Sequence, residues 1–103
     1  MPGKLVNDGW DAKYVPEAVK NYIATQAVVV VNQYQTTLLN LAGDNGAQGD
    51  GMLNYLGAFH KRFSGSWCIL YLWKPRKDGK GTYLAVTGLG RKNGTGNDYS
   101  QVI

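Results

Sequence analysis

The sequence has few of the residues on which enzyme active sites depend. It contains one cysteine, one histidine and a single glutamate, Glu17. One cysteine cannot form an internal disulfide, and a lone histidine needs several partners to hold a metal ion. We therefore expect no metal, no cofactor and no catalytic residues, and we predict that the chain is not an enzyme.

Cys68 and His60 are the two side chains that nucleophilic chemistry would use. Cys68 lies among aromatic and aliphatic residues in a segment typical of a buried strand. A nucleophilic thiolate needs partial exposure and a cationic neighbour instead. His60 stands at the end of a segment with helical spacing. We expect Cys68 in the core and His60 at a helix end.

Long apolar runs are also absent. The longest aliphatic run, residues 27–31, is too short to span a bilayer, and the N-terminus has no signal-peptide pattern. The single cysteine fits a reducing compartment. These features predict a cytoplasmic protein without membrane insertion. A length of 103 residues predicts one domain, residues 1–103.

Positive charge is concentrated in the C-terminal half. Residues 1–59 carry three cations and five acids, whereas residues 60–103 carry eight cations and two acids. The net charge of +4 therefore arises entirely after residue 59. Such a distribution favours an acidic partner. Three classes of partner fit: an acidic protein face, a nucleic acid and a phospholipid surface. The alternative is a charged surface that only keeps the protein soluble.

The most informative segment is residues 66–87, SWCILYLWKPRKDGKGTYLAVT. Its first half alternates aromatic and aliphatic residues with period 2, and Asp78-Gly79 supplies a turn. Apolar residues at both odd and even positions indicate a central strand that is covered on both faces. The segment predicts a β-hairpin with a cationic tip.

Upstream of this hairpin, the pattern predicts a helix and then two strands. A proline followed by a glutamate begins the predicted helix at residues 16–25. The valine run at residues 27–31 favours a strand, because β-branched side chains lose rotamer freedom in a helix. Residues 34–41 would then be its hairpin partner. The alternative is a helix that continues through the valines.

Asp50 is a suitable N-cap for a second helix, which the apolar spacing places at residues 51–63. The glycines of residues 88–96 predict a basic loop, and residues 99–103 predict an edge strand. That edge could pair with a second copy of the chain and form a homo-oligomer. The fold class expected is α+β, with a small, mainly antiparallel sheet and two helices in the order helix-strand-strand-helix-strand-strand.

Basic and aromatic residues gather on and after the hairpin. The basic group comprises Lys74, Arg76, Lys77, Lys80, Arg91 and Lys92. The aromatic group comprises Trp67, Tyr71, Trp73 and Tyr83. Because aromatic faces stack on bases and cations neutralise phosphates, the two groups together have the parts of a surface for single-stranded nucleic acid. The alternative, which we prefer, is that the aromatic group forms the core.

The order of the elements resembles that of profilins. Trp10 precedes the first helix, a valine strand follows, and a second helix leads into a hairpin with Asp78-Gly79 at its turn. The resemblance implies a profilin-like fold, binding of actin monomers, and an aromatic site for proline-rich peptides that Trp10 and Tyr14 would form. The strands and helix with which profilins end have no counterpart in this chain.

These observations favour a non-catalytic module that docks an acidic macromolecular surface through the basic group. An acidic protein is the first partner that we expect. Single-stranded nucleic acid, bound by the aromatic and basic groups together, is the second. A nucleotide-sequestering protein or a small enzyme is the third.

Overall fold

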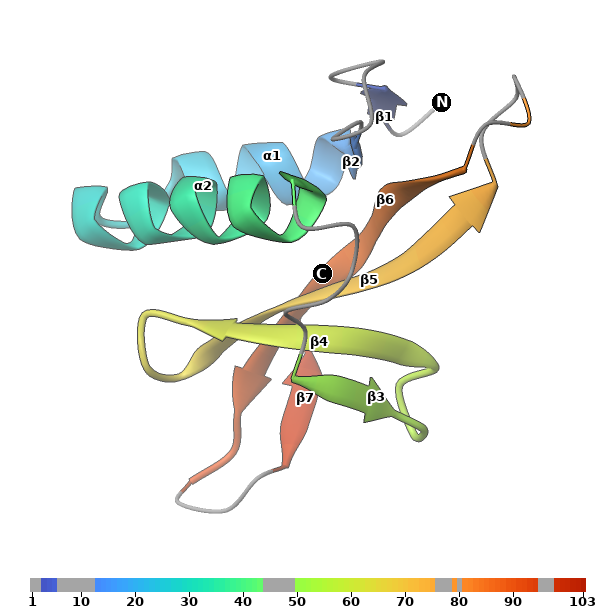
Figure 1. Ribbon diagram of the computed structural model, residues 1–103. Helices are drawn as coiled ribbons and strands as arrows, with labels where there is room; N and C mark the ends of the chain where they lie inside the picture. The colour runs from blue at the N-terminus through green and yellow to red at the C-terminus, as the bar shows by residue number, and fades with distance from the viewer. Residues whose placement is uncertain (1–2, 6–12, 44–49, 76–78, 80, 95–97) are drawn as a thin grey trace.

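The computed structural model describes residues 3–5, 13–43, 50–75, 79, 81–94 and 98–103. Its helices and strands lie in the order shown in Figure 1. They are β1 (Gly3–Leu5), β2 (Lys13–Pro16), α1 (Glu17–Ala24), α2 (Val28–Gly43), β3 (Gly51–Leu53), β4 (Ala58–Phe63), β5 (Trp67–Pro75), β6 (Thr82–Lys92) and β7 (Tyr99–Gln101).

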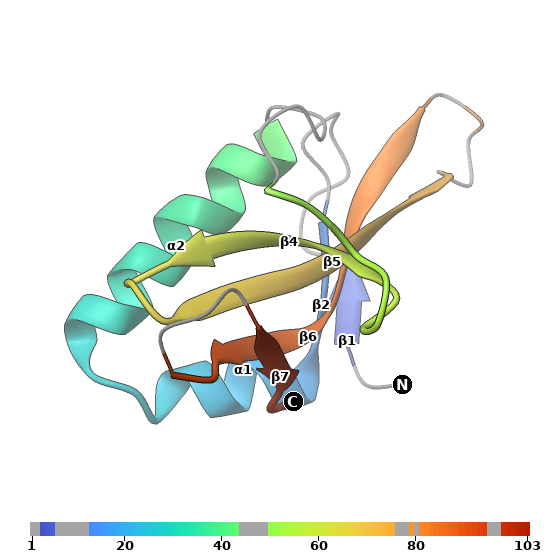
Figure 2. The same cartoon turned by 90° about the horizontal axis from the view of Figure 1, so that it is seen from below.

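The described strands form one sheet in the order β1-β2-β6-β5-β4-β3, and β7 also pairs with β6. β2 runs parallel to β6, and the other pairs are antiparallel. β2 and β7 share one edge of β6, because β2 pairs near its start and β7 near its end. Figure 2 looks at the sheet from below, where β7 lies beside β6, and Figure 1 shows β3 beside β4. The expected α+β class with a mainly antiparallel sheet is confirmed.

Both helices cover the same face of the sheet (Figure 1). β5 directs Trp67, Ile69 and Tyr71 into the main core, where they are 3%, 0% and 1% exposed. From α2, Tyr34 and Leu38 pack against this layer. Burying side chains of this size contributes about 1.5–3 kcal/mol each, so this aromatic and aliphatic layer is a main source of stability.

The helix expected at residues 16–25 is confirmed as α1, but the strands expected at residues 27–31 and 34–41 are wrong. Residues 28–31 and 34–41 lie in one helix, α2, and Ala27 directly precedes it; this helix is the alternative weighed above. Four valines lower helix propensity by at most about 0.7 kcal/mol each. Burial of Tyr34, Leu38 and Leu41 at helical spacing contributes about 1.5–3 kcal/mol each, which outweighs that cost.

The helix expected at residues 51–63 is also wrong. The segment forms the hairpin β3–β4, so Asp50 caps no helix. Gly57, with φ +66°, has a left-handed conformation in the turn between β3 and β4, directly before β4 begins. The residues of β4 alternate between two faces instead of following a helical period. Both faces contact buried residues, and a strand can bury residues on two faces in this way.

The hairpin expected at residues 66–87 is confirmed as β5 and β6. The predicted loop at residues 88–96 is wrong over its first part, because β6 continues to Lys92. Two glycines in it serve close packing: a Cβ at Gly90 would lie 2.6 Å from the Cys68 sulfur, and one at Gly88 would lie 2.3 Å from the Ile103 carbonyl oxygen. The edge strand expected at residues 99–103 is confirmed as β7.

The Tyr34 hydroxyl is buried and has no hydrogen-bond partner among the described residues. Replacing Tyr34 by Phe removes this unpaired group and keeps the ring, whose centroid lies 5.8 Å from that of Phe63. We expect the free energy of unfolding in urea at neutral pH to stay constant or to rise by up to about 1 kcal/mol.

The stability of the same variant should differ from that of the wild type at alkaline pH. Burial raises the pKa of Tyr34 from 10.0 to about 12. The unfolded chain therefore loses this proton before the folded chain does, and wild-type stability should fall as the pH rises through this interval. Tyr34→Phe should lose less stability over the same pH interval. A variant that is clearly less stable than wild type at neutral pH would show that the hydroxyl has a partner.

Replacing Gly90 by Ala should destabilise the protein, because the new methyl group meets the Cys68 sulfur in the closed space between β5 and β6. Overpacking of this kind costs about 1–3 kcal/mol. Cys68→Ala should remove most of that cost in the double variant, which a double-mutant cycle in urea measures as a coupling of about 1 kcal/mol or more. Additive effects would contradict the contact.

Candidate binding site on the helix-free face of the sheet

The face of the sheet opposite the helices carries two polar residues of β4, His60 and Arg62. Cross-strand register places His60 opposite Leu70, and Arg62 opposite Cys68, which in turn pairs with Gly90. These residues alternate with those that face the helices, so they belong to the other face. We call this surface the helix-free face.

A small second core covers part of the helix-free face. Ala58, Cys68, Leu70 and Tyr99 are buried in it, with Leu53 and Leu56 packed against them. The turn between β3 and β4 closes over β7 through Tyr55, whose hydroxyl oxygen accepts a hydrogen bond of 2.9 Å from the Tyr99 N–H. This contact joins residues that are 44 positions apart in the chain.

Beside this small core lies a hollow of about 310 Å³, which we call the β3–β4–β7 hollow. It is lined by Asp50, Leu53, His60, Arg62 and Tyr99. Small-ligand sites in proteins range from about 300 to 1,000 Å³, so this hollow suits a small group. It unites an acid, an imidazole, a guanidinium and a phenol.

Asp50 is tied to β4 by main chain and by charge. Its N–H donates to the His60 carbonyl oxygen at 2.7 Å, and its Oδ2 accepts from the Arg62 N–H at 2.7 Å. Lys61 Nζ lies 3.5 Å from Oδ1, whereas Arg62 Nε lies 3.9 Å from Oδ2. The carboxylate is therefore compensated by Lys61, and the Arg62 guanidinium contacts it only loosely.

His60 is 9% exposed, and its ring is oriented by Gly51. The distance from Nδ1 to the Gly51 carbonyl oxygen is 2.8 Å. A carbonyl oxygen only accepts, so Nδ1 carries the proton in this hydrogen bond. In the neutral ring Nε2 is then an acceptor, and it has no hydrogen-bond partner among the described residues.

Tyr99 closes the hollow on the side of β7. Burial raises the pKa of its phenol above the ordinary value of 10.0, and hydrogen bonding to the Arg62 side chain together with the charge of Arg62 partly offsets this rise. The hydroxyl is therefore protonated at neutral pH. The ring centroids of Tyr99 and His60 lie 5.4 Å apart, so both side chains reach the same space.

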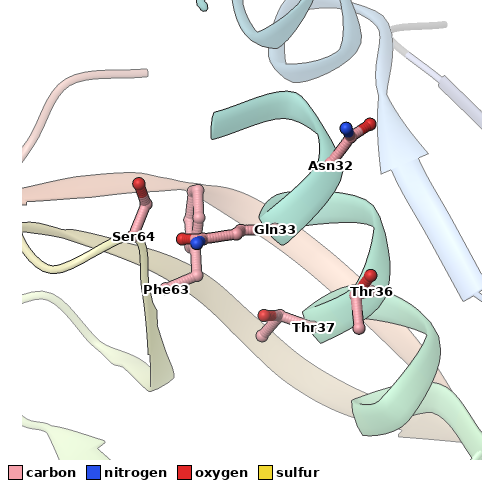
Figure 3. A pocket seen from close by; sticks show the side chains of 6 residues that line it. All are labelled: Asn32, Gln33, Thr36, Thr37, Phe63 and Ser64. Atoms are coloured by element: carbon pink, nitrogen blue, oxygen red, sulfur yellow. The ribbon is translucent and has the colours of Figure 1, made fainter. Parts of the chain in front are cut away.

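A second hollow, of about 260 Å³, lies between α2 and the end of β4. Figure 3 shows its lining: Gln33 extends from α2 toward Phe63 and Ser64, whereas Asn32 points away from them. Thr36 and Thr37 complete it. All of its polar groups are neutral amides and hydroxyls, so its lining supplies neither a charge for an ionic ligand nor a titratable group for catalysis.

The described members of the basic group predicted from the sequence lie on both faces of the sheet. Lys74 and Lys92 lie on the helix-free face, at opposite ends of the β5–β6 pair. Arg91 lies on the helix-covered face, with its guanidinium carbon 4.6 Å from the centroid of the Trp67 ring. Three further members lie outside the described residues. They are Arg76, Lys77 and Lys80.

The aromatic group divides between the two faces. Trp67 and Tyr71 are buried in the main core, and the half-buried Trp73 packs against it. Only Tyr83, the cross-strand partner of Lys74, lies on the helix-free face. Three of the four aromatic residues therefore belong to the core, which is the alternative that we preferred. The four do not form a shared stacking surface.

The peptide site implied by the profilin resemblance is not described at the level of side chains. Trp10 lies outside the described residues, and for Tyr14 the structure describes only the backbone, in β2. The sequence-based prediction for these two residues stays a prediction.

Sequence reasoning missed the residues that line the β3–β4–β7 hollow. It placed Asp50, His60 and Arg62 on one helix, where they would not have met Tyr99. The signal that could have found them is the alternation in residues 58–63, where Phe59 and Phe63 interleave with polar residues in period 2. The approach of Tyr99 leaves no local signal, because it depends on how the C-terminal strand returns along β6.

Comparisons with protein-family models, curated proteins and solved structures find no match for the chain. Among the described residues, no group of three or more histidine, cysteine, aspartate or glutamate side chains could hold a metal ion. No helix in that part of the chain is long and apolar enough to cross a membrane. Function must therefore be argued from the chemistry of the helix-free face.

Cys68 should react slowly in the folded protein, because it is 0% exposed and burial raises the pKa of its thiol from 9.0 to about 11. The charge of Asp50 raises this pKa further, and a hydrogen bond with the Gly90 backbone partly offsets the rise. At slightly alkaline pH, alkylation by iodoacetamide should be at least about 100-fold slower than in urea, as followed by mass spectrometry. Equal rates would contradict a buried, protonated thiol.

Proposed function

We propose that the protein is a non-catalytic binding module that docks an acidic macromolecular surface, and that an acidic protein is its partner. The observation that carries the proposal is the distribution of charge over the sheet. The helices cover one face, and Arg62, Lys74 and Lys92 belong to the other. Asp50, an acid on that face, is already compensated by Lys61.

Two cations of this face, Lys74 and Lys92, are suited to partner binding because, unlike Arg62, they form no ion pair with a described acid. Lys74 is exposed and Lys92 is half-buried, and neither forms a salt bridge with a described acid. Exposed cations of this kind attract an acidic partner and orient it during association. The profilin resemblance also favours a protein partner, and two helices on a curled sheet are loosely compatible with it.

Single-stranded nucleic acid is the second candidate. The helix-free face presents Tyr83, half-buried, beside Lys74, and the Tyr55 side chain is 59% exposed. Aromatic rings with neighbouring cations can stack on bases while neutralising phosphates. The burial of Trp67 and Tyr71 removes two of the four rings on which this candidate first depended.

Charge reversal at Lys74 and Lys92 tests the docking proposal. The double variant Lys74→Glu/Lys92→Glu should bind fluorescent polyglutamate at least about tenfold more weakly than wild type, a loss of about 1.4 kcal/mol. The matched control is Lys20→Glu, on α1, whose own ion pair with Glu17 is exposed and weak. The control should change the affinity less than about twofold.

The outcomes separate the two candidates. Lys20→Glu changes the net charge half as much as the double variant does. If it also costs about half as much binding free energy, only net charge matters, which contradicts a docking face. A labelled single strand that binds more tightly than polyglutamate at about 200 mM salt, with quenched tyrosine and tryptophan emission, would make nucleic acid the partner. Replacing Arg76, Lys77 and Lys80 together tests the sequence-based prediction for those residues in the same assay.

A further inference from the structure

Among the described residues, the charged side chains in and beside the β3–β4–β7 hollow sum to a positive charge: Asp50 and Arg62 line it, and Lys61 pairs with Asp50 from beside it. The Asp50 carboxylate accepts from the Arg62 N–H and faces Lys61 Nζ at 3.5 Å. One lysine and one arginine therefore surround one carboxylate, which leaves a net charge of +1. The Arg62 side chain is 54% exposed, so an anion can approach its guanidinium from solvent. Arginine presents paired N–H donors that match phosphate geometry.

Two further groups of the hollow suit the hydrogen-bonding pattern of a phosphate. The Tyr99 hydroxyl is protonated at neutral pH and can donate to a phosphate oxygen. His60 is held through Nδ1 by Gly51, so Nε2 either accepts from a protonated phosphate oxygen or, in the imidazolium form, donates. Both rings are held in place, Tyr99 in the small second core and His60 by Gly51, so binding orders few side chains.

An exposed aromatic residue, Tyr55, is hydrogen-bonded to the backbone of Tyr99, which lines this hollow. Tyr55 is 59% exposed, yet its hydroxyl is tied to the Tyr99 N–H at 2.9 Å. A large ring that is both fixed and open to solvent is a suitable surface for stacking a nucleic-acid base, which contributes about 1–3 kcal/mol. Tyr99 lines the hollow, so this hydrogen bond ties the Tyr55 side chain to a residue of the hollow, although Tyr55 itself does not line it.

We propose that the β3–β4–β7 hollow binds the phosphate group of a nucleotide through Arg62, Tyr99 and His60, and that Tyr55 stacks on the attached base. This site goes beyond docking of an acidic surface, because one small ligand fills it and it does not use Lys74 or Lys92. The nucleotide is either free or part of a single strand, since both present the same phosphate and base.

The experiment compares three probes on the full chain: adenosine monophosphate, inorganic phosphate and adenosine. Calorimetric titration should give the tightest binding for adenosine monophosphate, weaker binding for inorganic phosphate and the weakest for adenosine. A short single strand of adenylate residues is the fourth probe. If it binds more tightly than the free nucleotide and is displaced by it, the ligand belongs to a strand; if it binds more weakly, the ligand is the free nucleotide.

Variants then assign each part of the site. Arg62→Gln should weaken the binding of both adenosine monophosphate and phosphate by at least about tenfold, because a charged hydrogen bond is lost. This variant keeps the backbone N–H that holds Asp50, so the fold should persist, which a thermal melt verifies. His60→Asn keeps a donor near the Gly51 carbonyl and removes Nε2, and it should weaken both probes less than Arg62→Gln does.

Tyr55 is tested with two replacements. Tyr55→Leu should weaken adenosine monophosphate but leave inorganic phosphate unchanged, whereas Tyr55→Phe, which keeps the ring, should retain most of the affinity. Lys20→Gln, on α1 and outside the hollow, is the control and should bind all probes as wild type does.

Absence of binding by adenosine monophosphate and by inorganic phosphate at millimolar concentration would overturn the proposal, as would an unchanged affinity in Arg62→Gln. Equal affinity for phosphate and adenosine monophosphate would overturn the role of Tyr55. The docking proposal is judged separately, because Lys74→Glu/Lys92→Glu changes polyglutamate binding and should leave nucleotide binding within about twofold.

Discussion

The structure depends on the burial of one aromatic layer of β5 beneath both helices. Trp67 contacts Tyr22 of α1, at a ring-centroid distance of 5.9 Å, and Phe63 of β4, at 6.2 Å. Phe63 in turn meets Tyr34 of α2 at 5.8 Å. This chain of rings joins both helices to the centre of the sheet. It also explains why Trp67 cannot serve as a ligand surface: its ring is already enclosed on the helix-covered face.

Because the helices are committed to one face, the other face of β5 has to be covered by small elements. The turn between β3 and β4 and the strand β7 bury Cys68 and Leu70 fully, whereas Leu72 and Lys74, further along the same face of β5, are half-buried and exposed, respectively. The β3–β4–β7 hollow lies at the border of that cover. Polar residues concentrate there because β4 alternates, so the residues that do not face the helices lie toward the hollow and remain near water. The candidate site thus lies where one face of β5 is covered by short elements only, while the helices cover the other face.

The fold class and the central hairpin were predictable from sequence, and two other segments were not. By local propensity alone, a run of four valines indicates a strand. Burial of Tyr34, Leu38 and Leu41, which recur at helical spacing, stabilises the helix α2 by more than the low helix propensity of the valines costs. The apolar residues of 51–63 fit a helical spacing and also a strand's alternation, so the sequence alone does not distinguish the two. The candidate site was lost with that segment, because a helix would have dispersed Asp50, His60 and Arg62.

The sequence by itself determined the α+β class, the β5–β6 hairpin, the burial of Cys68 and the excess of positive charge after residue 59. Each of these follows from local alternation, turn chemistry or composition. The tertiary structure alone decided which face the helices cover and therefore which aromatic residues are enclosed. It also decided that Tyr55 and Tyr99 meet and that Tyr99 lines the same hollow as His60 and Arg62. These contacts join residues about 40 positions apart, and the free energy that forms them comes from burying surface between distant strands, which no local pattern records.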